Sequence, residues 1–173
     1  MTKSTGIIRR IDDLGRIIIP KEIRRTLRLR EGDPMEIFTQ NGEVLFQKYS
    51  PIGELGNFAQ NFADSLFETT GHIALICDRD CVIAVSGASK KEFVNKPIWN
   101  LAQLSMEERD TKIGYSAIVK EEFKYQSQVV TPIIHEGDVI GVVALISKQY
   151  DMETPEQKMV EIVAKTLEKH MEC

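Results

Sequence analysis

The chain has 173 residues, of which 42% are hydrophobic and 28% are charged, and its formal net charge at pH 7 is −4. This composition is typical of a water-soluble globular protein of one large or two small domains, and the longest apolar runs are too short to span a membrane. The N-terminus has no apolar signal region and the three cysteines lack framework spacing, so we expect a cytoplasmic protein without a disulfide scaffold or a membrane partner.

The first fifty residues predict four short strands and one short helix. The expected strands span 5–11, 16–19, 35–39 and 44–48, and the expected helix spans 21–29. Aspartates and Gly15 form a turn at 12–15, Pro20 suits the start of a helix, and Asn41-Gly42 is a strong hairpin signal. So short a unit buries little surface alone, and we therefore predict that it folds as an intertwined dimer.

A helix is predicted over residues 51–70, with Ser50 as its cap and Pro51 in its first turn. Its apolar residues alternate in spacings of three and four, as in a coiled-coil seam: Ile52, Leu55, Ala59, Phe62 and Leu66. The seam is too short for an independent coiled coil, so two interpretations stay open. The helix packs on its own domain or on a partner's helix. The two interpretations are compatible, because one helix can make both contacts.

From Gly71 onward the pattern predicts an antiparallel sheet with flanking helices. The expected strands span 72–77, 81–86, 129–135 and 139–147, and the expected helices span 90–94, 97–104 and 154–171. Residues 105–127 have weak periodicity and predict a mobile segment, with a short strand near 115–119. Thr154 and Gln157 form the capping box of the last helix. The expected fold class is therefore α+β.

Arginines give the N-terminal segment a charge opposite to that of the whole chain. The first thirty residues hold seven arginines and two lysines against three acidic residues. Residues 1–50 carry a net charge of +3, and residues 51–173 carry −7. Guanidinium groups bind phosphates and guanine edges, so DNA is the favoured partner. The alternative is a solvated basic face balanced by Asp12, Asp13 and Glu22.

The segment STGIIRRIDDLGRIIIPKEIRRTL at 4–27 resembles the swapped-hairpin DNA-binding domain of AbrB-type transition-state regulators. The likeness extends through Glu36–Phe38 to Lys48–Tyr49. It implies that two chains exchange hairpins to form one dimeric β-barrel that binds double-stranded DNA. By position, it implies DNA contacts from Arg9, Arg16, Arg24 and Arg25, with Lys3 and Arg10 as auxiliaries.

The remainder is similar to a family of sporulation regulators that join such a domain to a GAF domain, a sensory α/β fold. The motifs ICDRD at 76–80 and IAVSGASKK at 83–91 carry this likeness. It implies a nucleoid-associated transcription regulator of forespore genes, with an unidentified small-molecule effector and tetramers built through helices 51–70 and 154–171. The implied domains are a DNA-binding domain over 1–49, a linker helix over 50–70 and a GAF-like sensor over 71–173.

Two other classes of function stay open. Swapped-hairpin domains also serve as antitoxins, but these usually carry a disordered acidic tail, whereas the second half of this chain is patterned as a globular domain. An enzyme would need a nucleophile–base pair, which the sequence does not show. Cys77 and Cys81 flank a turn and are either packed side chains or a redox pair. His72, His135 and His170 lack ligand spacing, so no metal or other cofactor is expected.

Overall fold

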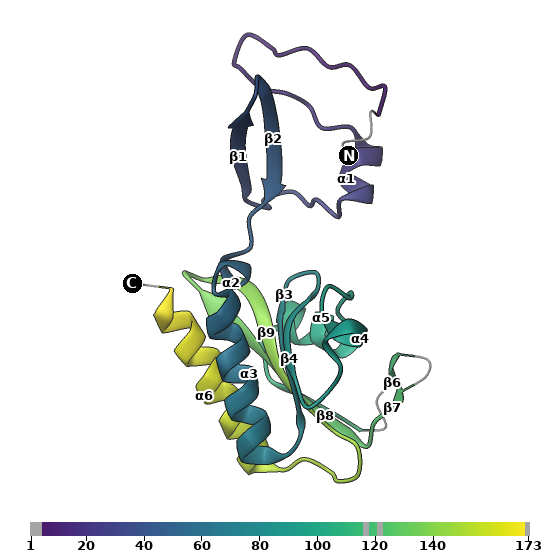
Figure 1. The fold of residues 1–173 in the computed structure, drawn as a ribbon, viewed down its shortest axis with the longest axis vertical. Helices are drawn as coiled ribbons and strands as arrows, with labels where there is room; N and C mark the ends of the chain where they lie inside the picture. The colour runs from purple at the N-terminus through teal and green to yellow at the C-terminus, as the bar shows by residue number, and fades with distance from the viewer. Residues whose placement is uncertain (1–4, 116–117, 121–122, 172–173) are drawn as a thin grey trace. The chain divides into compact units, whose positions relative to one another are not determined.

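The computed structural model describes residues 5–115, 118–120 and 123–171 (Figure 1). The chain divides into two compact units, Met1–Tyr49 and Ser50–Cys173, which are called the head and the body below. Each unit has its own sheet, and no strand is shared between the two units among the described residues.

The head contains one short helix and one β-hairpin. Helix α1 (Lys21–Thr26) follows Pro20, and strands β1 (Met35–Gln40) and β2 (Glu43–Lys48) are antiparallel. Asn41 and Gly42 join these strands with φ angles of 51° and 80°. Two successive residues in the left-handed region form the turn that matches the twist of a hairpin. The predicted hairpin is therefore confirmed.

Two predicted strands are wrong for the described part of the head. Residues 5–11 and 16–19 form no β-ladder, although the turn between them is formed. A strand needs a neighbour for its N–H and C=O groups, and these segments find none within the described part of one chain. Helix α1 also ends earlier than predicted, because Arg28 with φ 54° turns the backbone out of the helix.

The described part of the head has no buried residue. Most of its large apolar side chains are exposed to solvent; Ile8 is 86% exposed and Ile18 is 75% exposed. Burying one such side chain contributes roughly 1.5–3 kcal/mol, so a unit that leaves most of them in water lacks much of the main stabilising contribution to folding. The head alone is therefore an incomplete folding unit.

The body is built on a five-stranded antiparallel sheet in the order β4-β3-β9-β8-β5. Its strands are β3 (Ile73–Asp78), β4 (Val82–Ser86), β5 (Lys112–Tyr115), β8 (Ser127–His135) and β9 (Asp138–Ser147). The short strands β6 (Ile118–Lys120) and β7 (Phe123–Lys124) form a separate pair. Strands β3 and β9 follow the predicted ones closely, since each is a nearly continuous apolar run that is mostly buried. Strand β5 was not predicted.

Helices cover the two faces of the sheet. α2 (Pro51–Glu54), α3 (Gly56–Thr70) and α6 (Thr154–His170) pack on one face, and Figure 1 shows α3 and α6 side by side. The other face carries α4 (Lys90–Phe93) and α5 (Asn100–Glu108). The predicted helix 51–70 is thus interrupted at Leu55, which lies close to two glycines of low helix propensity.

The apolar seam of the linker helix packs on its own domain. Ala59, Ala63 and Leu66 are buried against the sheet together with Val160 and Leu167 of α6. Ser50 caps α2 as predicted, since its hydroxyl accepts a hydrogen bond from Gly53 N at 3.1 Å. The structure therefore supports the packing interpretation and leaves contact with a partner's helix as a prediction.

Two further predictions for the body are wrong in detail. Residues 105–115 are not a mobile segment, because α5 continues to Glu108 and β5 follows; both elements are too short for a clear periodic pattern. The predicted strand at 115–119 falls partly on residues outside the described part.

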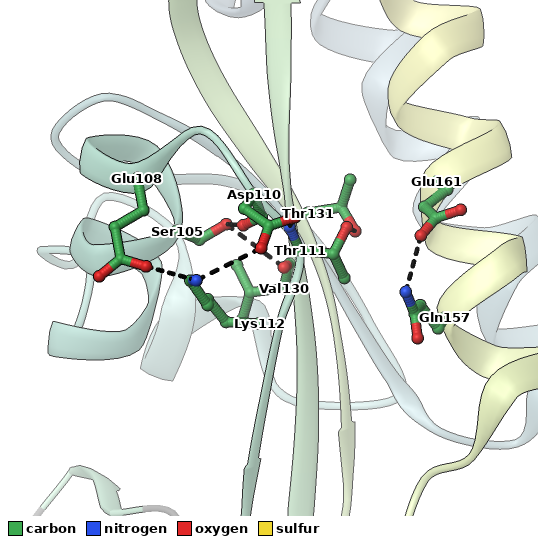
Figure 2. Close-up of polar contacts among 9 residues, drawn as sticks. All are labelled: Ser105, Glu108, Asp110, Thr111, Lys112, Val130, Thr131, Gln157 and Glu161. Atoms are coloured by element: carbon green, nitrogen blue, oxygen red, sulfur yellow. Dashed lines mark hydrogen bonds and ion pairs between the residues drawn. The ribbon is translucent and has the colours of Figure 1, made fainter.

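The predicted capping box of α6, Thr154 with Gln157, is shifted by one residue. The capping box uses Glu153 and Glu156, with Glu153 N donating to Glu156 Oε2 at 3.1 Å. Gln157 instead donates to Glu161 (Figure 2).

Polar contacts hold α5 against the edge of the sheet (Figure 2). Ser105 Oγ donates to Asp110 O at 2.8 Å and lies 3.3 Å from Val130 O. Lys112 Nζ forms ion pairs with Glu108 and, at 3.4 Å, with Asp110. These bonds join the helix end to both β5 and β8, so the short edge strand is anchored by side chains as well as by its ladder.

Candidate nucleic-acid interface

Asp12 organises the turn that precedes Arg16. Its Oδ1 accepts hydrogen bonds from Leu14 N at 3.0 Å and from Arg16 N at 2.8 Å, and its Oδ2 lies 2.8 Å from Arg16 Nε. The backbone N–H of Arg16, and then its side chain, lower the pKa of Asp12 because both stabilise the carboxylate. Gly15 closes the turn with φ 76°. Arg16 is thus held next to a fixed turn while 69% of its side chain remains exposed.

Arg24 and Arg25 lie in the last turn of α1 and are exposed. Adjacent residues on a helix point about 100° apart, so the two guanidinium groups leave the helix in different directions. Pro20 begins this helix, and its carbonyl accepts from Arg24 N at 3.0 Å. The helix therefore presents two cations from one short, rigid element.

Arg9 and Arg10 lie in the segment before the turn and are both exposed. Arg9 Nη1 donates to the carbonyl of Ile8 at 3.1 Å. Lys3, the remaining predicted contact residue, lies outside the described residues. The structure thus describes five of the six predicted residues, and all five are exposed on the head.

These arginines have few acidic partners. Arg16 pairs with Asp12, but among the described residues Arg9, Arg10, Arg24 and Arg25 form no ion pair. An exposed guanidinium without a carboxylate neighbour keeps its positive charge and its N–H hydrogen-bond donors available for a phosphate. Among the five described contact residues, only Arg16 therefore fits the alternative interpretation of a basic face that is neutralised by acidic residues of the head.

Lys48 has a structural role that the sequence pattern did not indicate. Its Nζ lies 2.8 Å from Oδ2 of Asp33, whose side chain is only 1% exposed. The same carboxylate oxygen accepts from Arg30 N at 2.8 Å. Lys48 and Asp33 are far apart in the sequence and follow no periodicity, so only the folded hairpin brings them together.

Cys77 and Cys81, the two cysteines in the described part of the body, are packed residues in this structure. Cys77 is fully buried, and burial first, then the neighbouring Asp78 and Cys81, raise the pKa of its thiol well above the ordinary value. A buried neutral thiol is a poor nucleophile. Cys81 is half-buried, with Sγ 3.7 Å from Asp78 Oδ2. The packing interpretation is favoured over a redox pair.

The face of the sheet beneath α5 holds an internal polar contact. Trp99 Nε1 donates to Gln128 Oε1 at 2.7 Å, and both residues are buried. Burial, and then the charge of Glu92, raise the pKa of the buried Tyr125 on the same face. No group of three His, Cys, Asp or Glu residues in the described ranges is arranged to hold a metal ion. In the same ranges no helix is long and apolar enough to cross a membrane.

Two family profiles match the chain. The one described as "Stage V sporulation protein T C-terminal, transcription factor" matches residues 54–172, which is more than half of the chain. The one described as "Antidote-toxin recognition MazE, bacterial antitoxin" matches residues 8–53. The boundary between the two matches lies close to that between head and body.

Two curated relatives come from Bacillus subtilis (strain 168). Stage V sporulation protein T is 50% identical over 176 residues, which cover 98% of this chain and 99% of the relative. The transition state regulatory protein AbrB is 49% identical over 49 residues, or 28% of this chain and 51% of AbrB. The likeness to the first relative extends over both units, and the likeness to AbrB is short.

Solved structures resemble the body. A GAF domain from an Acinetobacter phosphoenolpyruvate-protein phosphotransferase has a TM-score of 0.58 and 16% identity, covering 68% of this chain and 82% of that one. A free methionine-R-sulfoxide reductase from Neisseria meningitidis, in complex with its substrate, has a TM-score of 0.58 and 18% identity, covering 69% and 79%. Such identities show the fold alone. The body has the GAF fold, as the sequence resemblance predicted.

Proposed function

This chain belongs to the stage V sporulation protein T family, and we propose that it regulates the transcription of sporulation genes in the forespore by binding double-stranded DNA through its head. The observation that carries this proposal is the set of exposed arginines on the head, of which four have no acidic partner among the described residues. The proposed contact residues are Arg9, Arg16, Arg24 and Arg25, with Arg10 and Lys3 as auxiliaries.

The arrangement of charge supports DNA as the partner. Polyanions attract clustered guanidinium groups, and each neutralised phosphate releases counterions that favour association. The body carries the acidic excess of the chain and would repel DNA, so the head is the only basic unit available for contact. Phosphate contacts would set the affinity and orientation, and contacts to base edges would select the sequence.

A swapped-hairpin dimer accounts for the incomplete head. The described residues 5–49 include no residue that is buried as a whole, and the segments on either side of the 12–15 turn have no strand neighbour. A second head would supply both the neighbouring strands and the cover for the apolar side chains. In such a dimer every arginine occurs twice, which doubles the cationic surface.

The body supports a role in assembly and sensing. Beyond the buried seam, Leu55, Phe58 and Phe62 of the α2–α3 segment remain partly buried, and Ile162 of α6 is 64% exposed. These side chains leave apolar area on the helical side of the body that a second body can cover, which would join dimers into tetramers. A small molecule bound to the GAF fold would then act by changing how the bodies associate.

An antitoxin is the second candidate, because the head matches the MazE profile over residues 8–53. Against this, the body forms a folded sheet with buried cores on both faces rather than a tail that could wrap a toxin. An enzymatic activity of the body lacks positive support, since the methionine-R-sulfoxide reductase from Neisseria meningitidis resembles the body in fold alone. The transcription regulator is therefore the interpretation that explains both units.

Nuclease protection by the intact protein tests the proposal. Promoter fragments of sporulation genes from a spore-forming host should show discrete protected sites, whereas duplexes of equal length from coding regions should not. The Arg24→Ala, Arg25→Ala variant should abolish the protection and keep its oligomeric state. Uniform weak protection of every duplex would leave only non-specific DNA binding, and no protection at low salt would favour the antitoxin.

A further inference from the structure

The chain leaves helix α1 through Arg28, which lies in the left-handed backbone region with φ 54°. Leu29 N donates to Arg24 O at 2.8 Å and Arg28 N donates to Arg25 O at 3.3 Å, so the helix end is closed by two backbone bonds. Glycine is the residue usually found at such a position, because a Cβ is disfavoured there. Here the position carries an exposed arginine instead.

The loop that follows Arg28 is fixed by the ion pair of Lys48. Besides its 2.8 Å contact with Asp33, Lys48 Nζ reaches the carbonyl of Arg28 at 3.4 Å. Asp33 also holds the backbone N–H of Arg30 at 2.8 Å. A preformed loop loses little conformational freedom on binding, so a side chain presented from it binds at lower entropic cost.

Arg28 extends the cationic surface at the end of α1. It follows Arg24 and Arg25 by four and three residues, and the bonds that close the helix keep it directly beyond them. Among the described residues Arg28 forms no ion pair with an acidic side chain. Arg28 thus carries an exposed guanidinium without an acidic partner, on a backbone that hydrogen bonds hold next to two proposed contact residues, and these are the properties of a phosphate-binding residue.

We propose that Arg28 is a further DNA-contacting residue, which binds a backbone phosphate beside the contacts of Arg24 and Arg25. This inference rests on the proposed function, because it assumes that the head binds DNA. It adds a residue that the resemblance to AbrB-type domains did not assign. A phosphate contact contributes to affinity on every sequence and therefore changes the salt dependence of binding rather than the choice of bases.

The test compares Arg28→Gln with Arg28→Lys in the intact protein, by DNA affinity at several salt concentrations. Both variants keep a side chain in the left-handed region, so their difference reports the charge. Removing one phosphate contact from each of two heads should make the slope of log K against log salt shallower by about 2 in Arg28→Gln. Arg28→Lys should keep most of the slope.

Arg109→Gly and Arg28→Gly form a matched control pair. Arg109 ends α5 in the body, is exposed and has φ 56°, so it shares the residue type and the backbone geometry of Arg28. Either glycine should leave the thermal midpoint unchanged or raise it by a few degrees, because glycine suits the left-handed region. Only Arg28→Gly should weaken DNA binding, by roughly tenfold.

The variant Arg24→Ala distinguishes failure of this inference from failure of the proposed function. If Arg24→Ala weakens binding while Arg28→Gln and Arg28→Gly match the wild type, Arg28 makes no contact and this inference is wrong, but the proposed function stands. If none of these variants changes the affinity or the slope, the head is not the DNA-binding surface and the proposed function fails with it. Equal weakening by Arg28→Lys and Arg28→Gln would also overturn the inference, because charge would then not matter.

Discussion

The Nε atom of Arg16 lies 2.8 Å from Oδ2 of Asp12, while Oδ1 of the same carboxylate holds the turn closed through Arg16 N at 2.8 Å. The acid that neutralises this arginine is therefore also the group that positions it. The two effects of Asp12 oppose each other in DNA binding, since its charge repels phosphate and its hydrogen bonds place a cation.

Substituting Asp12 distinguishes these effects. In Asp12→Ala we expect weaker DNA binding, because the carboxylate that accepts three hydrogen bonds in the turn is removed and Arg16 is no longer held in position. A purely electrostatic account predicts the opposite, since the head gains one positive charge. Titration of a duplex with the variant measures the change, and Asp13→Ala is the matched control. Tighter binding by both variants would contradict the positional role of Asp12.

The lowered pKa of Asp12 predicts how the turn responds to acid. The ordinary pKa of an aspartate is 3.8. A group whose pKa is lower in the folded state stabilises that state above the unfolded value, and this stabilisation is lost as pH falls through the folded value. We therefore expect the turn to persist at pH 5 and to open only below about pH 4. The amide NMR shifts of Leu14 and Arg16 report this, and a midpoint at or above the ordinary value would refute it.

Gly141 permits the close approach of strands β3 and β9. It pairs with Asp78, and a Cβ built on it would collide with the carbonyl oxygen of Cys77. We expect Gly141→Ala to destabilise the body by roughly 3 kcal/mol, because the backbones of two central strands must separate. Chemical unfolding followed by circular dichroism measures this change.

Gly137→Ala is the comparison for Gly141→Ala. Gly137 lies in the β8–β9 turn with φ 84°, and a Cβ there would meet no atom within 4 Å. Its substitution adds backbone strain without a clash and should cost about 1 kcal/mol. Equal destabilisation of the two variants would mean that the collision at Gly141 is relieved by small movements.

The unburied head predicts that a fragment of residues 1–50 is a dimer. Such a fragment should fold only as its concentration rises, with a thermal midpoint that depends on concentration, because folding and association are the same event. Sedimentation equilibrium gives the mass directly. A folded monomer would contradict the swapped-hairpin proposal, since the apolar side chains of the head would then need no cover.

The sequence predicted the local elements of this protein more accurately than its tertiary contacts. The hairpin at Asn41-Gly42 and the apolar runs of β3, β8 and β9 follow from turn chemistry and hydrophobic patterning, both of which are local. The strands at 5–11 and 16–19 were also predicted from local patterning, but their formation depends on a neighbour that the described part of one chain does not contain.

The parts of the site that the sequence did not predict depend on contacts between distant residues. Lys48 and Asp33 meet only because the β1–β2 hairpin returns to the loop after α1, and no spacing rule connects them. The left-handed backbone of Arg28 was not predicted either, since a glycine, which would have indicated the helix end, is absent from that position. The arginine cluster itself was evident from charge alone.

The salt dependence of DNA binding by the intact protein tests the central claim most directly. The wild type should bind with a steep inverse salt dependence. The variant Arg16→Ala, Arg24→Ala should reduce the slope of log K against log salt by about 4, because it removes two phosphate-binding cations from each of two heads. Lys91→Ala, Arg109→Gly removes two exposed cations from the body and should leave the slope unchanged. Equal slopes for the wild type and both variants would show that the arginines of the head do not contact DNA.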